Sequence, residues 1–255
     1  MKKLRKNKKI GLALGGGAVL GAAHVGVLRV LEEFNISVSY LAGTSIGAFV
    51  SALYAFNKNW KEIEKIAMHL NWLDVSRLSL SQYGLLSNKK LGELVTEIIG
   101  DVDFDQANIP VAMIATDISN GKKIVLKEGN VATSVMASTC IPGVFVPVEI
   151  KDKLLVDGAI VENVPITPLR EMGADFIIGV DLIANHSHKK PKNIVEVLIN
   201  SFDFIIMTAS KLQSEEADIL IKPDLSSFNI VETDQTADLI EKGYLEAKSI
   251  LKKIV

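Results

Sequence analysis

Gly43-Thr44-Ser45-Ile46-Gly47 is the stretch of this sequence that decides the fold. The residues before it, Val38 to Ala42, predict a short strand, and the apolar, alanine-rich residues after it, Ala48 to Phe56, predict a helix. A serine with glycine two positions away on either side is typical of a nucleophile elbow, which leaves the hydroxyl at a helix N-terminus. Side chains at either glycine position would clash in so tight a turn. Ser45 is therefore the candidate nucleophile, and Gly43 and Gly47 are the elbow glycines.

A second glycine motif precedes the elbow. Gly15, Gly16 and Gly17 follow a strand predicted for Ile10 to Leu14 and precede a predicted helix. Glycine lets backbone N–H groups approach a ligand closely, and the helix N-terminus adds partial positive charge. The anion held there is either a pyrophosphate or the oxyanion of an acyl intermediate. The spacing to Gly21 does not fit a dinucleotide fingerprint, so we favour an oxyanion hole over a phosphate site or a turn that only packs.

The base for such a serine is ambiguous. His24 and His69 lie within predicted helices, where a structural role is expected. His186 and His188 follow Asp157 in the sequence, which gives the Ser, Asp, His order of an ordinary triad. Asp157 itself ends a predicted strand and precedes Gly158-Ala159. A buried aspartate has a raised pKa and accepts a proton more readily, although Asp-Gly is also a common turn. Both bases stay open at this point.

Composition narrows the function classes. The chain has 255 residues, 48% of them hydrophobic, and 28 basic residues nearly balance 30 acidic ones, so no net field favours nucleic acid. Residues 1–9 form a basic arm, which is either a solvated tail or a contact for anionic lipid headgroups. Cys140 is the only cysteine, so no intrachain disulfide forms and a reducing cytoplasm is expected.

Three long stretches without Asp, Glu, Lys or Arg resemble membrane segments: residues 10–28, 34–57 and 130–148. Glycine interrupts each of them, with serine in the second and serine and proline in the third, which is typical of strands and helices buried on both faces in an α/β core. We therefore expect neither a membrane span nor a cleaved leader, and we place the protein in the cytoplasm, in peripheral contact with a membrane at most.

Strand-like and helix-like segments alternate along the chain. Strands are predicted at residues 10–14, 38–42, 111–117, 122–126, 153–156, 176–181 and 219–222, and helices at about 22–34, 48–56, 61–70, 89–99, 130–138, 194–212 and 233–254. This alternation predicts a three-layer α/β/α fold around a mostly parallel central sheet. No linker divides it, so residues 10–255 are expected to form one domain after the basic arm.

Three ordered blocks resemble the patatin-like phospholipase family, over nearly the whole chain. The glycine loop with Ala22-Ala23-His24-Val25-Gly26-Val27-Leu28 is similar to its oxyanion block, Gly43 to Gly47 to its nucleophile motif, and Asp157-Gly158-Ala159 to its Asp-Gly-Gly/Ala motif. Weaker matches are Ala115-Thr116-Asp117, the segment Ala137 to Gly143, and Asn163-Val164-Pro165. The chain departs from the family where Leu20 and Met136 replace residues that are often basic.

The resemblance implies a patatin-like fold and a Ser45–Asp157 dyad without histidine. Backbone N–H groups of the glycine loop would hold the oxyanion. The implied activity is hydrolysis of lipid acyl esters, of the phospholipase A or lysophospholipase type, with a lipid or acyl-ester substrate and no metal or cofactor. Two alternatives remain: a Ser-His-Asp esterase, and a non-catalytic lipid-binding module on the same scaffold.

Overall fold

The computed structural model describes residues 8–70, 77–78, 81–185, 190–213, 216–229, 232 and 234–254, with the backbone alone at 77–78, 208–209 and 211–213. His186, His188 and most of the basic arm lie outside these residues. The strands are β1 (Ile10–Leu14), β2 (Tyr40–Thr44), β3 (Arg77–Leu78), β4 (Gly84–Ser87), β5 (Val111–Asp117), β6 (Lys122–Leu126), β7 (Gly143–Phe145), β8 (Val148–Ile150), β9 (Lys153–Asp157), β10 (Phe176–Val180) and β11 (Ile219–Ile221).

The long helices lie close to their expected positions, whereas the five-residue helix α6 (Thr167–Glu171) was not predicted. The helices are α1 (Ala23–Glu33), α2 (Ile46–Ala55), α3 (Trp60–His69), α4 (Lys89–Ile99), α5 (Val131–Ser138), α6, α7 (Ile194–Gln213) and α8 (Thr236–Leu251), with the short 3-10 helices η1 (Ala18–Ala22), η2 (Phe104–Gln106) and η3 (Gly158–Ile160).

The central sheet is mixed and mostly parallel, which confirms the predicted fold class. Its strand order is β11-β10-β1-β2-β5-β9-β8, and β6 pairs with β5 outside this path. The pairs from β11 to β5 are parallel, whereas β9 and β6 both run antiparallel to β5, and β8 runs antiparallel to β9. A small second sheet, β3-β4-β7, contains Gly84 to Leu86 and Phe145, and its short strands were not predicted.

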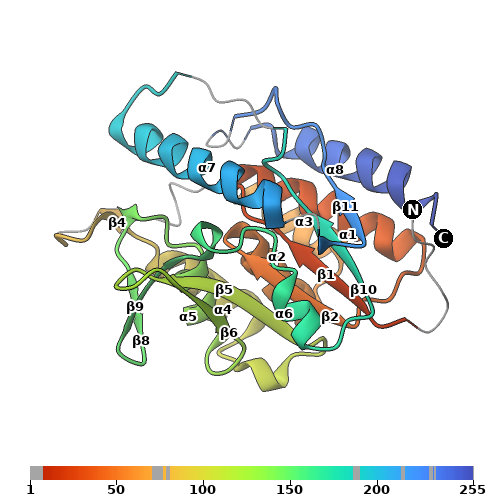
Figure 1. Cartoon of the computed structure of the whole chain (residues 1–255), viewed down its shortest axis with the longest axis horizontal. Coiled ribbons are helices and arrows are strands. Elements are labelled where there is room, and N and C mark those ends of the chain that lie inside the picture. Colours follow the sequence, from red (N-terminus) through yellow and green to blue (C-terminus); the bar gives the residue numbers. More distant parts are fainter. Residues whose placement is uncertain are drawn as a thin grey trace.

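Alternate side chains of the strands cover the two faces of the sheet. Leu12, Leu14 and Ile178 point into the main core with the large helices, whereas Ala13 and Ile177 belong to a smaller cluster with residues of α6. Both faces of the sheet are thus covered, but the core on one face contains many more residues than the cluster on the other. In Figure 1, α1 and α8 lie side by side and α6 lies apart from them, next to β1 and β2.

The turn around Ser45 is shorter than the sequence predicts. The sequence predicts a strand ending at Ala42 and a helix beginning at Ala48, but β2 continues to Thr44 and α2 begins at Ile46. A single residue therefore separates strand and helix. This compactness places the Ser45 side chain directly at the N-terminus of α2.

Candidate active site

Ser45 adopts a backbone conformation that only a tight elbow explains. Its φ is 56° and its ψ is −127°, a region that costs a non-glycine residue about 1–3 kcal/mol. A Cβ on Gly47 would lie 2.0 Å from the Leu14 carbonyl oxygen, and one on Gly43 would lie 2.3 Å from the Gly47 oxygen. Both flanking positions therefore exclude side chains, as expected from the motif. The strain is concentrated on the one residue whose hydroxyl the elbow presents.

Buried hydrogen bonds hold the elbow in place. The Ser45 N–H donates to Ser138 Oγ at 3.0 Å, and the Ser138 hydroxyl donates to the Ile114 oxygen at 2.6 Å. The Thr44 hydroxyl donates to the Glu162 oxygen at 2.9 Å. Ser138 comes from α5 and Ile114 from β5, so the elbow is fixed to elements that are distant in sequence. In the sequence, the segment around Ser138 is visible only as a weak family match and has no evident role.

The register of β5 brings Asp157 to Ser45. Thr44 of β2 pairs with Ile114, and Asp157 of β9 pairs with the next residue, Ala115. One side of β5 is occupied by β6, which pairs with Met113 to Asp117 and so overlaps the residues that pair with β2 and with β9. The strands β2 and β9 must therefore share the other side of β5. The two strands run toward each other there, and their C-terminal ends meet. The carboxylate that ends β9 consequently faces the residue that follows β2.

Asp157 is fully buried, and its pKa is raised to about 7, chiefly because burial disfavours the charged form. The nearby Ser45 side chain and a hydrogen bond from the Ala159 N–H lower the pKa, and the negative charge of Asp203 on α7 raises it. The Ala159 bond is 2.9 Å long and ends on Oδ1.

The second carboxylate oxygen, Oδ2, has no hydrogen bond of standard geometry within the described residues. The Ser45 hydroxyl thus influences the carboxylate without a well-aligned bond, which is common in catalytic pairs before substrate binds. Oδ2 is left available as a proton acceptor.

The glycine loop lies against the elbow, but its three N–H groups differ in their partners. A Cβ on Gly16 would lie 3.1 Å from Ser45 Cβ, so this glycine is a direct neighbour of the candidate nucleophile. Gly15 N–H donates to the Val180 oxygen at 3.0 Å, and Gly16 N–H donates to Asn163 Oδ1 at 3.0 Å. Gly17 N–H has no acceptor in the described part of the chain. Only one of the three candidate oxyanion donors is unoccupied.

Neither histidine that the structure describes bonds to Ser45 or Asp157. His24 is buried beneath the glycine loop, where its Nε2 pairs with the Gly15 oxygen at 2.8 Å. Burial lowers the pKa of His24 to about 4, so the ring is neutral and Nε2 carries the proton that the carbonyl accepts. His69 is exposed, and its Nδ1 pairs with the Lys65 oxygen of the same helix. Both contacts fit the structural roles predicted for these residues.

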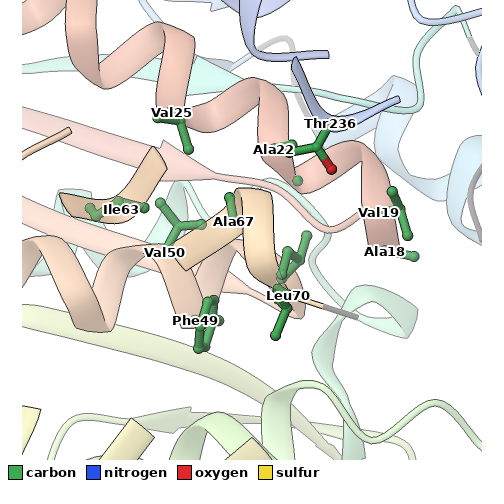
Figure 2. Close-up of a pocket in the computed structure, with 12 residues that line it drawn as sticks. Ala18, Val19, Ala22, Val25, Phe49, Val50, Ile63, Ala67, Leu70 and Thr236 are labelled. Carbon is green, nitrogen blue, oxygen red and sulfur yellow. The ribbon is translucent and has the colours of Figure 1, made fainter. Parts of the chain in front are cut away.

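The two departures from the family pattern are accommodated by packing. Leu20 is fully buried in the main core, and Met136 lies where a Cβ on Gly92 would come within 2.3 Å of its sulfur. An apolar pocket opens next to the Leu20 segment, between η1, α2 and α3 (Figure 2). Ile46 and Ala18 line it. Its cavity volume of about 30 Å³ is far below that of an ordinary ligand pocket, so it does not define an acyl-chain site by itself.

Helix α7 covers the region next to Asp157. Ile199, Asp203 and Ile206 on its inner face are buried, and the helix packs on η3 directly after Asp157. It runs along the outside of the molecule (Figure 1). Across the described ranges, no helix has both the length and the apolar composition needed to cross a membrane.

An elbow serine beside a glycine loop, on a mostly parallel α/β sheet, is the arrangement of serine hydrolases, and this is the class that the fold and site indicate. Comparison with known proteins narrows the class. The family described as patatin-like phospholipase matches residues 12–170, and the chain belongs to this family.

Relatives and solved structures agree with the assignment. An uncharacterised NTE family protein of Mycobacterium tuberculosis is 35% identical over 177 residues, 68% of this chain and 49% of that protein. A lysophospholipase, NTE1 of Meyerozyma guilliermondii, is 27% identical over 202 residues, 77% of this chain and 14% of the yeast protein. The chain therefore spans half or less of the length of these relatives.

The crystal structure of VipD from Legionella pneumophila matches with a TM-score of 0.60 at 13% identity and covers 99% of this chain and 68% of VipD. That of ExoU from Pseudomonas aeruginosa matches with a TM-score of 0.56 at 12% identity and covers 98% of this chain and 53% of ExoU. At this level of identity the likeness concerns the fold.

Proposed function

We propose that this protein is a serine hydrolase that cleaves acyl esters of lipids, of the phospholipase A or lysophospholipase type, through a Ser45–Asp157 dyad. The observation that carries the proposal is the position of Asp157. It is a fully buried carboxylate with a pKa of about 7, placed at the nucleophile elbow by the register of β5. Near neutral pH such a group alternates readily between accepting and donating a proton.

In the acylation half-reaction, Ser45 Oγ attacks the ester carbonyl as its proton passes to Asp157. The tetrahedral intermediate collapses, the bond to the leaving alcohol breaks, and Asp157 returns the proton to that alcohol. In deacylation, water attacks the acyl-serine, gives its proton to Asp157, and Ser45 regains a proton as the fatty acid leaves. Family membership supports a lipid ester as the substrate.

We assign the oxyanion to a narrower set of donors than the sequence suggests. Gly17 N–H has no acceptor among the residues that the structure describes, whereas Gly15 N–H is already bonded to Val180 and supports the loop instead. The N-terminus of α2, which begins at Ile46 immediately after the nucleophile, supplies further N–H groups and the positive end of the helix dipole. Gly16 shapes the loop against Ser45.

We further propose that the outer face of α7 contacts an anionic lipid surface. Ile194, Val197, Phe204 and Ile205 are between 42% and 62% exposed, and their spacing puts them on one side of the helix. Lys190 and Lys192 are exposed just before the helix, and basic residues beside an apolar face are typical of helices that lie on membranes. The bilayer would then lie one helix away from Asp157.

The dyad is tested with purified protein, p-nitrophenyl esters and lysophospholipids. We expect Ser45→Ala and Asp157→Asn each to lose hydrolysis to background while their circular dichroism spectra match the wild type. A fluorophosphonate probe should label the wild type at Ser45 alone. The double variant His186→Ala/His188→Ala is the control, and it should keep its activity. Loss of activity in this control would favour the triad, and binding of lipid without labelling or hydrolysis would favour a non-catalytic module.

A further inference from the structure

We infer that the side-chain amide of Asn163 is a further catalytic donor, which binds the carbonyl oxygen of the ester through Nδ2 as that oxygen becomes an oxyanion. The inference rests on the proposed function and extends its site by one residue. Asn163 follows η3 in the chain and is 1% exposed. It is therefore a buried amide in the loop that connects the end of β9 to α6.

The orientation of this amide is fixed by its partner. The group on the glycine loop is a backbone N–H, which can only donate, so the atom facing Gly16 must be the carbonyl oxygen, Oδ1, at 3.0 Å. The –NH₂ end consequently points away from Gly16 N–H and cannot exchange places with the oxygen without breaking that bond.

Nδ2 is buried and has no hydrogen-bond partner within the described residues. A buried donor left without an acceptor costs about 1–3 kcal/mol, and such groups are uncommon in folded proteins. The Gly16 bond accounts for the acceptor half of this side chain, but it does not account for the unsatisfied donor. A ligand oxygen in the site would satisfy it.

The position of the amide suits the ester carbonyl. The point that a Gly16 Cβ would occupy lies 2.8 Å from Asn163 Oδ1 and 3.1 Å from Ser45 Cβ, so the amide and the nucleophile flank the same glycine. The loop is also short of donors, because Gly15 and Gly16 N–H groups are both occupied. Asn163 occupies one of these donors, and the same side chain carries an unsatisfied donor of its own, Nδ2.

The experiment uses a trifluoromethyl ketone, which adds to the serine hydroxyl and leaves a tetrahedral oxyanion. In protein labelled with ¹⁵N-asparagine, the side-chain resonance of Asn163 is assigned by its absence in Asn163→Leu. We expect this resonance to move downfield when the ketone adduct forms on the wild type. It should not move with the matched secondary alcohol, nor when the ketone is added to Ser45→Ala. An unmoved resonance in the adduct would overturn the inference.

Kinetics provide a second readout. Asn163→Asp keeps an oxygen for Gly16 N–H but lacks the amide donor at alkaline pH. We expect its kcat to fall about 10²–10³-fold with little change in KM, the loss typical of one oxyanion donor. Wild-type kcat in this variant would contradict the inference and leave Asn163 a positioning residue for Gly16. If instead the wild type neither hydrolyses esters nor forms the adduct, the proposed function itself fails.

Discussion

Replacing Asp157 with asparagine should stabilise the protein while it removes activity. In the folded wild type the carboxylate is fully buried, and its pKa is held at about 7 instead of 3.8. The folded state therefore retains a proton that the unfolded chain loses over this interval of pH. Folding stability falls as pH rises from about 4 to about 7 and stays reduced above it. Asparagine has the same shape, is neutral at every pH, and can still accept the Ala159 N–H.

The size of the effect follows from the two pKa values. At about 1.4 kcal/mol per pH unit, a pKa of about 7 in place of 3.8 corresponds to a penalty of about 4 kcal/mol above neutrality. At pH 5 the penalty is only about 1–2 kcal/mol, because most of the folded protein is still protonated at Asp157. The gain from Asp157→Asn should thus be largest at pH 8 and vanish near pH 3.8.

Urea unfolding followed by circular dichroism, at pH 4, 5, 6, 7 and 8, measures this difference. Other groups titrate over the same interval, but they contribute equally to both proteins and cancel in the comparison. Ser45→Ala serves as the matched control, since it also removes activity and leaves the carboxylate in place. A difference between Asp157→Asn and wild type that does not grow with pH would refute the buried, proton-binding state of this aspartate.

Three further outcomes follow from the same geometry. The kcat/KM of the wild type should rise with pH through a single ionisation near 7, because Asp157 must be ionised to accept the Ser45 proton; a flat profile from pH 5 to 9 would exclude it as the base. Gly47→Ala should lower the free energy of unfolding by more than about 3 kcal/mol, or prevent folding, since the added carbon meets the Leu14 oxygen at 2.0 Å. Gly121→Ala is its control, because a Cβ added there would meet no atom within 4 Å and only the left-handed φ of 71° would cost about 1 kcal/mol. Equal losses of unfolding free energy in the two variants would contradict the clash at Gly47. Ile205→Ser should weaken binding to phosphatidylglycerol vesicles in sedimentation assays and leave hydrolysis of a soluble ester unchanged. Leu245→Ser, at a similarly exposed position on α8, should leave vesicle binding unchanged. Equal loss of vesicle binding in the two variants would contradict a lipid contact through α7.

Local sequence pattern was sufficient to predict most elements of this fold. The buried strands β1 and β10 are continuous apolar runs, β5 is apolar up to Thr116, and α4 begins and ends where the apolar spacing predicts. The short strands β7 and β8 were missed because three residues carry too little periodicity to be distinguished from a turn. The elements found this way were enough to predict an α/β fold.

The candidate site was predictable in its residue types more than in its connections. A glycine loop, an elbow serine and an aspartate at a strand end are each visible as short motifs. The partners of their backbone groups are not, because Val180, Asn163 and Ser138 come from distant segments whose approach depends on the folded sheet. Asn163 was visible only as part of a weak family match, Asn163-Val164-Pro165, and no feature of the sequence assigned it a role. A polar residue in a loop has no periodicity, and only its unsatisfied amide in the folded protein singles it out.

The mixed character of the sheet accounts for how a dyad could work here without histidine. In a purely parallel sheet, the ends of neighbouring strands open onto solvent, and an aspartate there would be hydrated with a pKa near 4. In this protein β2 ends at Thr44, and β9 pairs with the next residues of β5 in the antiparallel direction. Asp157 is therefore enclosed by β5, η3 and α7. Enclosure removes water from the carboxylate and raises its pKa to about 7, close to that of an ordinary histidine. The reversed strand thus gives an aspartate the proton affinity that a catalytic base needs near neutral pH.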